Sequence, residues 1–291
     1  MNHINRRTSV KKMIVGSLAA SVLPLIKLNA SPMKNSNLKG NVNHAVCAWT
    51  FGHLSLEELC KSIKKIGFNA IDLVGPKDWH ILQANGVDCS MCNGAEVSLE
   101  KGFNNKTYHE QLVKNYTEII PLVAKAGYKN LICFSGNRDG MDDETGLQNS
   151  VEGLKKVIGL AEKHKVTLVM ELLNSRIDHP DYMCDKTSWG VELCKRLGSD
   201  NFKLLYDIYH MQIDEGDLIR TIKNSHQYIA HYHTAGNPGR NEIDDSQEIN
   251  YPAVVKAILE TGFKGYICQE FMPKKENKLA SLEEAIKICD I

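Results

Sequence analysis

The sequence has no surplus of either charge. The 291-residue chain holds 35 lysines and arginines against 35 aspartates and glutamates. Five of the basic residues and no acidic residue lie in the first thirty positions, so the remainder has 30 basic and 35 acidic residues. A nucleic-acid-binding surface requires a basic patch, and this composition argues against one.

The sequence also lacks the glycine-rich motifs that hold phosphate groups. No GxGxxG follows any strand-like segment, which argues against a dinucleotide-binding open sheet. No other glycine-rich phosphate loop is visible, and this disfavours a phosphorylated substrate. Apart from the alternation of strand-like and helix-like segments, the chain has no internal repeat.

The apolar run at the N-terminus, residues 13–26, is shorter than the ~20 residues that a membrane-spanning helix needs. Small residues near Ala30 follow it, and four basic residues precede it: Arg6, Arg7, Lys11 and Lys12. This layout is typical of an export signal, and the arginine pair resembles a twin-arginine signal. We therefore predict a twin-arginine-like signal peptide over residues 1–30, export to the periplasm, and membrane contact only during export. An ordinary secretory signal and a retained anchor are the alternatives.

Cysteine is too dispersed for a disulfide scaffold, with nine residues spread along the chain. Several, such as Cys47, Cys133 and Cys268, lie in apolar runs where a small buried side chain is expected. We predict that most are reduced core residues. Cys89 and Cys92 form a CxxC, but their spacing in a strand predicts side chains on opposite faces, which favours a structural role over redox or zinc chemistry.

Residues 31–43 are polar and are expected to form a linker. Beyond them, apolar segments alternate with amphipathic ones. The expected strands are 44–51, 69–75, 88–95, 130–136, 166–174, 203–211, 228–235 and 264–271. The expected helices are 55–66, about 77–85, 108–127, 144–164, 187–197, 216–224, 251–261 and 280–289.

These eight strands are mostly apolar throughout rather than alternating, which indicates a parallel sheet covered by helices. Removing residues 1–30 leaves 261 residues, close to the ~250 of a typical TIM barrel. We predict an α/β fold, a single-domain (β/α)8 TIM barrel over residues 44–291. A doubly wound open sheet is the structural alternative.

Polar side chains end the apolar parts of four consecutive expected strands. They are Glu171, Asp207, His233 and Glu270. A TIM barrel gathers the C-terminal ends of its strands at one rim, where active sites lie. Three carboxylates placed there repel one another unless a cation compensates them. Although any one of these residues alone could be solvated or structural, together they predict a site for one divalent ion such as Mn²⁺, Mg²⁺, Co²⁺ or Zn²⁺.

The segments ELLNSRIDHPDY, LLYDIYHMQIDEGDL, HYHTAGNPGRNEID and QEF resemble hydroxypyruvate isomerase and the wider xylose isomerase-like group of sugar isomerases and epimerases. The likeness covers essentially the whole chain after the signal, with its specific motifs in residues 171–272. The resemblance implies that Glu171 and Glu270 bind the metal and exchange protons with the substrate, and that Asp207 is a metal ligand. It also implies that His210 and Arg240 bind substrate.

One position departs from the hydroxypyruvate isomerase pattern. His233 lies where those enzymes usually carry glutamine and where ketose epimerases carry a metal-binding histidine. The metal site is kept, but the resemblance no longer specifies hydroxypyruvate as the substrate.

Further pocket residues are expected with open alternatives. Asn174, Arg176 and His179 follow the fifth strand and could line the pocket or a solvated loop. Glu96 is expected to contact sugar hydroxyls, and Trp49 a sugar face, with simple packing as the alternative for the tryptophan.

These residues and the resemblance predict a metal-dependent sugar isomerase acting on a small carbohydrate or keto-sugar. The metal would stabilise a cis-enediolate while one glutamate removes a proton next to a carbonyl and the other returns it. A carbohydrate epimerase and a 3-keto-sugar lyase or hydratase pass through the same enediolate, and export together with His233 favours them. A non-catalytic sugar-binding protein of the cell envelope is the alternative from another class. The oligomeric state stays open, a homo-oligomer included.

Overall fold

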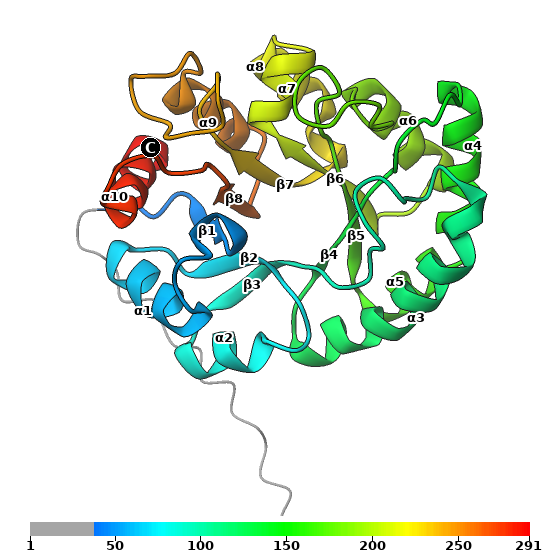
Figure 1. Cartoon of the computed structure of the whole chain (residues 1–291), viewed down its shortest axis with the longest axis horizontal. Helices are drawn as coiled ribbons and strands as arrows, with labels where there is room; N and C mark the ends of the chain where they lie inside the picture. The colour runs from blue at the N-terminus through cyan, green and yellow to red at the C-terminus, as the bar shows by residue number, and fades with distance from the viewer. Residues whose placement is uncertain (1–37) are drawn as a thin grey trace, which may run out of the picture. The chain divides into compact units, whose positions relative to one another are not determined.

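The computed structural model describes residues 38–291, which form a closed barrel of eight parallel strands with helices around it (Figure 1). Each strand pairs with its neighbours in the sequence, and β8 pairs with β1. The strands are β1 (Asn43–Cys47), β2 (Ala70–Val74), β3 (Asp88–Cys92), β4 (Asn130–Cys133), β5 (Thr167–Glu171), β6 (Phe202–Asp207), β7 (Ile229–Thr234) and β8 (Tyr266–Gln269). The predicted TIM barrel is confirmed; the predicted signal peptide lies outside the described residues.

Ten α-helices and three short 3-10 helices connect the strands of the described part of the chain. The α-helices are α1 (Leu56–Ile66), α2 (Trp79–Asn85), α3 (His109–Ala126), α4 (Asp143–Leu154), α5 (Ile158–His164), α6 (Thr187–Leu197), α7 (Ile208–Asp214), α8 (Leu218–Ser225), α9 (Tyr251–Glu260) and α10 (Lys278–Cys289). The 3-10 helices are η1 (Trp49–Phe51), η2 (Lys106–Tyr108) and η3 (His226–Tyr228). Within residues 38–291, none of the helices is long and apolar enough to cross a membrane.

The strands are shorter than expected, and the segment after β6 is a helix where a strand was expected. The expected strand 203–211 ends at Asp207, and the helix α7 begins at the next residue. The carboxylate of Asp207 accepts a hydrogen bond from the backbone N–H of His210 at 3.0 Å, which caps the first turn of α7. A short apolar run does not distinguish a strand from a buried helix, so this helix was missed. The expected helix 144–164 is likewise two helices, α4 and α5.

Two expectations near the first three strands are wrong. Val42 is buried in the core and Asn43 begins β1, so the end of the expected linker belongs to the barrel. Cys89 and Cys92 do not point to opposite faces, because their Sγ atoms lie 3.6 Å apart. The pairing of β2 with β3 shifts register at this point, and such a bulge interrupts the alternation of side chains along a strand. All nine cysteines are buried and free, as expected for core residues.

The first and last parts of the described chain meet at Asp290. Its carboxylate accepts a hydrogen bond from the backbone N–H of Lys39 at 2.5 Å. His44, on β1, lies 3.8 Å from the same carboxylate and is 3% exposed. Neither ring nitrogen of His44 has a hydrogen-bond partner, so a charge on this ring would be poorly compensated.

We expect the substitution His44→Asn to make the fold less sensitive to acid. Burial lowers the pKa of His44 from 6.5 to about 4, although Asp290 opposes the shift. Between these values the unfolded chain binds a proton that the folded chain excludes, so the free energy of unfolding falls as the pH drops, by about 1.4 kcal/mol per pH unit. Denaturant unfolding at neutral pH and near pH 4 should show roughly 3 kcal/mol less acid destabilisation in the variant.

The matched control for this prediction is His80→Asn, because His80 is an exposed histidine on α2. It should lose stability with acid as the unmodified chain does. If His44→Asn and the unmodified chain show the same dependence on pH, the excluded proton does not belong to His44.

Candidate metal centre

The barrel brings the four predicted ligands together. Glu171 ends β5, Asp207 ends β6, His233 lies in β7, and Glu270 directly follows β8. Asp207 and His233 are paired in register across β6 and β7. All four side chains are buried, and one ligand atom from each lies within 4.8 Å of the others. Residues that are up to a hundred positions apart in the sequence therefore form one compact cluster.

His233 lies at the middle of this cluster. Its Nδ1 atom is 3.0 Å from Oε1 of Glu171, 3.0 Å from Oε2 of Glu270 and 3.9 Å from Oδ2 of Asp207. Although they are buried, neither Nδ1 of His233 nor Oε1 of Glu171 has a hydrogen-bond partner. A divalent cation takes carboxylate oxygens and imidazole nitrogen as ligands. The donor set and the unpartnered atoms therefore fit a divalent metal ion.

The ionisable side chains of the cluster shift one another's pKa values. Burial raises the pKa of Asp207, and the nearby Glu270 carboxylate raises it further. Burial alone would raise the pKa of Glu270, but His233 and Arg240 outweigh it and hold that pKa well below its usual value. Burial is the largest influence on the pKa of His233 and would lower it, but Glu270, Cys47, Asp72 and Glu171 together outweigh burial and raise it well above its usual value. The negative charge of the buried Glu270 carboxylate is thus stabilised mainly by the neighbouring positive charges of His233 and Arg240.

The far side of the His233 ring is held by a residue that sequence reasoning missed. Asp72, on β2, is fully buried, and its Oδ2 atom lies 3.1 Å from Nε2 of His233 and 2.5 Å from Nε2 of His231. Ser90 donates a hydrogen bond to the other carboxylate oxygen. A proton on Nε2 that is donated to Asp72 leaves the Nδ1 lone pair directed at the cluster.

Two of the predicted substrate-binding residues surround Glu270. Arg240 donates a hydrogen bond to Oε2 of Glu270, and its guanidinium lies 5.2 Å from the centre of the Trp49 ring. The indole N–H of Trp49 donates to Oε1 of the same carboxylate at 3.0 Å. Trp49 is 46% exposed, so it is not a packed core residue. It presents part of its ring to solvent beside the cluster.

Two further predicted residues, His210 and Asn174, form a pair beside Asp207. The side-chain amide of Asn174 donates to Nδ1 of His210 at 2.6 Å. Burial and Arg240 lower the pKa of His210, so the ring is neutral and carries its proton on Nε2. That atom lies 3.8 Å from Oδ2 of Asp207 and has no hydrogen-bond partner. His210 therefore directs an available N–H donor towards the cluster.

The remaining candidates are placed differently. One carboxylate oxygen of Glu96, Oε2, accepts hydrogen bonds from the backbone N–H groups of Gly94 and Ala95 within its own loop. Arg176 is exposed and lies 3.4 Å from Asp214 rather than at the cluster. The ring of His179 packs against that of His210, with 5.2 Å between ring centres.

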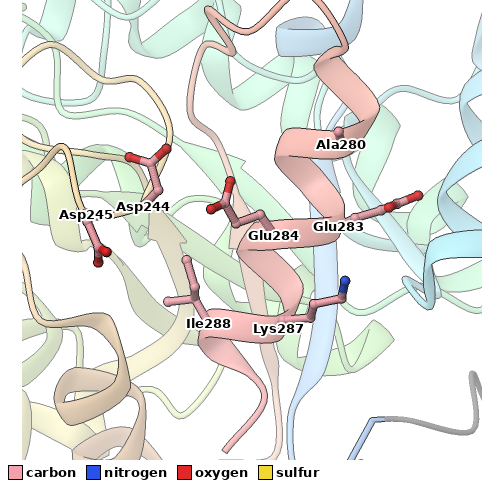
Figure 2. Close-up of a pocket in the computed structure, with 7 residues that line it drawn as sticks. All are labelled: Asp244, Asp245, Ala280, Glu283, Glu284, Lys287 and Ile288. Carbon is pink, nitrogen blue, oxygen red and sulfur yellow. The ribbon is translucent and has the colours of Figure 1, made fainter.

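A separate pocket lies between the loop after β7 and helix α10, as Figure 2 shows. Its lining is mostly charged, and Lys275 bridges two of its acids, Asp244 at 2.8 Å and Glu284 at 2.5 Å. None of its lining residues belongs to the metal cluster; they are Asp244, Asp245, Ala280, Glu283, Glu284, Lys287 and Ile288.

Residues 60–290 match the family model described as "Xylose isomerase-like TIM barrel". The chain belongs to this family. It is 27% identical over 235 residues to the hydroxypyruvate isomerase of Escherichia coli K12, covering 77% of this chain and 90% of that protein. It is 35% identical over 230 residues to the putative hydroxypyruvate isomerase of Drosophila melanogaster, covering 76% and 87%.

The barrel is also similar to solved structures. The crystal structure of D-psicose 3-epimerase from Clostridium cellulolyticum H10 matches with a TM-score of 0.70 at 16% identity, covering 86% of this chain and 100% of that one. At this identity the likeness shows a shared fold. Within the xylose isomerase-like family, this chain carries a buried Glu, Asp and His cluster suited to a metal ion at the rim of the barrel.

Proposed function

We propose that this chain is a metal-dependent sugar isomerase that moves a proton next to a carbonyl group. The observation that carries the proposal is the pair of buried glutamates, Glu171 and Glu270, whose carboxylates each lie 3.0 Å from Nδ1 of His233. They come from β5 and β8, with the two strands that carry Asp207 and His233 between them. A substrate at this rim would have one carboxylate on each side of it.

Proton transfer is the step that this arrangement favours. When bound, the divalent ion polarises the carbonyl and offsets the negative charge that develops on its oxygen. One carboxylate accepts the proton from the hydroxyl-bearing carbon next to the carbonyl, and the other glutamate, which must enter the step protonated, delivers a proton to the former carbonyl carbon. The hydroxyl proton passes to the former carbonyl oxygen, so the carbonyl moves by one carbon. Both carboxylates are buried, and between turnovers they exchange protons with the solvent, so deuterium from D₂O enters the substrate.

The neighbouring side chains would bind and orient the sugar. Arg240, which is only partly exposed beside Glu270, supplies N–H donors for substrate oxygens. His210 supplies the donor on Nε2 that has no partner within the described chain. The exposed part of the Trp49 ring offers an apolar surface for one face of a sugar. The names of the two relatives, hydroxypyruvate isomerase and putative hydroxypyruvate isomerase, support an isomerase acting on a small keto compound.

A carbohydrate epimerase is the second candidate, and His233 is the observation that favours it. A histidine completes the cluster at the position where the sequence departs from the hydroxypyruvate isomerase pattern. An epimerase, like a 3-keto-sugar lyase or hydratase, begins by removing the same kind of proton. It differs in where the proton returns or in whether a leaving group departs.

The test follows the C–H signals next to the carbonyl by NMR in D₂O. The metal-loaded protein is incubated with ketoses, aldoses, 3-keto glycosides and hydroxypyruvate. Metal-dependent loss of one C–H signal together with migration of the carbonyl supports the isomerase. Inversion at one carbon supports the epimerase, and loss of a leaving group the lyase. If the protein binds a sugar saturably but no C–H signal exchanges, it is a sugar-binding protein and not an enzyme acting on these compounds.

The loop that carries Arg240 provides a further prediction. Gly236 donates its backbone N–H to the carbonyl of Asn241, and a Cβ atom at Gly236 would lie 2.1 Å from the carbonyl oxygen of Glu242. We expect Gly236→Ala to displace the loop and with it the guanidinium beside Glu270. The free energy of unfolding should fall by about 1–3 kcal/mol, and kcat/KM by about a hundredfold.

Thermal unfolding and the exchange assay check this prediction, with Gly159→Ala as the control. Gly159 lies in α5, and no atom lies within 4 Å of a Cβ atom placed there. Alanine at that position should leave exchange unchanged and raise the free energy of unfolding by up to about 1 kcal/mol. An active Gly236→Ala variant with unchanged stability would show that the loop adapts without moving Arg240.

A further inference from the structure

A second group of metal-ligating side chains shares His233 with the first cluster and touches it through Cys47, whose Sγ lies 3.4 Å from Oε1 of Glu270. It consists of Cys47, Asp72, His233 and Cys268, and one ligand atom from each lies within 4.8 Å of the others. All four residues have no measurable exposure. They come from β1, β2, β7 and β8, which are adjacent around the barrel and include the seam where β8 pairs with β1.

Two distances among these atoms fit a tetrahedral thiolate site. The Sγ atoms of Cys47 and Cys268 lie 3.7 Å apart. Two sulfurs each about 2.3 Å from a tetrahedral zinc ion lie about 3.8 Å from each other. Oδ2 of Asp72 and Nε2 of His233 are 3.1 Å apart, which is close enough for both to bind one ion. Two sulfurs, one nitrogen and one oxygen complete the four ligands that zinc takes.

We propose that Cys47, Asp72, His233 and Cys268 form a second metal site, which binds a thiophilic divalent ion such as Zn²⁺. The cluster of Glu171, Asp207, His233 and Glu270 has no sulfur ligand, so the two sites differ in the ions they select. Thiolates favour Zn²⁺ and Co²⁺, whereas Mg²⁺ and Mn²⁺ favour oxygen ligands. This inference goes beyond the proposed function, because proton transfer between Glu171 and Glu270 does not require the second ion.

His233 links the two sites. Its Nδ1 atom faces Glu171 and Glu270, and its Nε2 atom faces Asp72. Binding at the second site replaces three protons, one from each thiol and one from Nε2, and all three are released to solvent. The ion would then connect four neighbouring strands across the seam of the barrel. It would stabilise the folded chain by mass action, since an unfolded chain does not hold the four ligands together.

Simple packing without a metal ion would also place these four side chains together, and the experiment must distinguish packing from metal binding. Buried thiols pack as small apolar side chains, and Asp72 is already hydrogen-bonded to His231 and Ser90. Packing alone predicts thiols that stay protonated in the presence of a thiophilic ion. A metal site predicts two thiolate ligands to the same ion.

The experiment titrates the metal-free full chain with Co²⁺ and follows its absorption, since thiolate ligation adds a near-ultraviolet charge-transfer band. The unmodified chain should bind two Co²⁺ ions and develop this band. The double variant Cys47→Ser, Cys268→Ser should bind one ion without the band. Cys133→Ser, which replaces another fully buried cysteine on β4, should behave as the unmodified chain does.

Thermal unfolding with added Zn²⁺ or Mn²⁺ tests the proposal even if the double variant is less stable than the unmodified chain. Zn²⁺ should raise Tm more in the unmodified chain than in the double variant, whereas Mn²⁺ should raise Tm equally in both. The single variant Cys268→Ser should weaken the charge-transfer band without removing it. A single Co²⁺ per unmodified chain with no thiolate band overturns the proposal, as does a band that persists in the double variant. Neither outcome depends on whether the chain exchanges substrate protons.

Discussion

Replacing Glu171 or Glu270 with glutamine should lower the rate of substrate proton exchange by about a hundredfold to ten-thousandfold. Glutamine has nearly the same shape as glutamate, and its amide oxygen can still ligate a metal ion, but it cannot accept and return a proton. Metal binding should therefore weaken less than exchange. Single-turnover exchange in D₂O gives the rate, and elemental analysis gives the metal content of each variant.

The control for these variants is Glu118→Gln. Glu118 lies on the exposed face of α3, outside the cluster, and the substitution makes the same chemical change. It should leave both exchange and metal content unchanged. If a Glu171→Gln or Glu270→Gln variant that is folded and metal-bound keeps full turnover, that residue does not transfer the proton, and the proposed mechanism is wrong for it.

The barrel could be predicted because most of its strands are apolar rather than alternating between apolar and polar residues. A strand covered on one side by helices and on the other by the barrel interior has no polar face, and eight such segments alternating with amphipathic helices leave few folds. The same reasoning found the cluster. Glu171, Asp207, His233 and Glu270 are polar residues at the ends of apolar runs, where the barrel brings strand ends together. The local sequence pattern, together with the rule that TIM-barrel active sites lie at the C-terminal ends of the strands, was sufficient to predict the four ligands.

The residues that support the cluster could not be found in this way. Asp72 lies in the middle of an apolar strand, and its partners His231 and His233 are about 160 positions away in the sequence. Only closure of the barrel, through the pairing of β8 with β1, brings β2 near β7, so no local pattern indicates the contact. The contact of Cys89 with Cys92 depends on a register shift between β2 and β3, which also leaves no sequence periodicity. A polar residue inside an apolar strand was the one available signal for Asp72.

The substitution Asp72→Asn is expected to weaken both the metal centre and the fold. Asparagine keeps the shape of the side chain but removes the charge that faces two buried imidazole rings. It can also present its N–H₂ group to His233, which would remove the constraint that directs Nδ1 at Glu171 and Glu270. Loss of a residue that orients a metal-ligating histidine typically costs 10–100-fold in metal affinity, and we expect a loss in that range.

Stability should fall as well, because breaking a buried charge pair by removing one partner costs about 3–5 kcal/mol. Mn²⁺ is the appropriate ion for the affinity measurement, since it does not favour the thiolates of Cys47 and Cys268. Ser90→Ala is the control: it removes one hydrogen bond to the same carboxylate and leaves the charge in place. It should retain Mn²⁺ affinity within a few-fold and lose only about 1 kcal/mol.

The two measurements separate the two roles of Asp72. A fall in stability with unchanged Mn²⁺ affinity would mean that Asp72 only holds His231 in place through its contact with Nε2 of that ring, and that the orientation of His233 is fixed by the packing of β7. A fall in Mn²⁺ affinity that persists under conditions where the variant is fully folded would mean that the carboxylate acts through His233. The metal centre would then extend past β8 and β1 to β2.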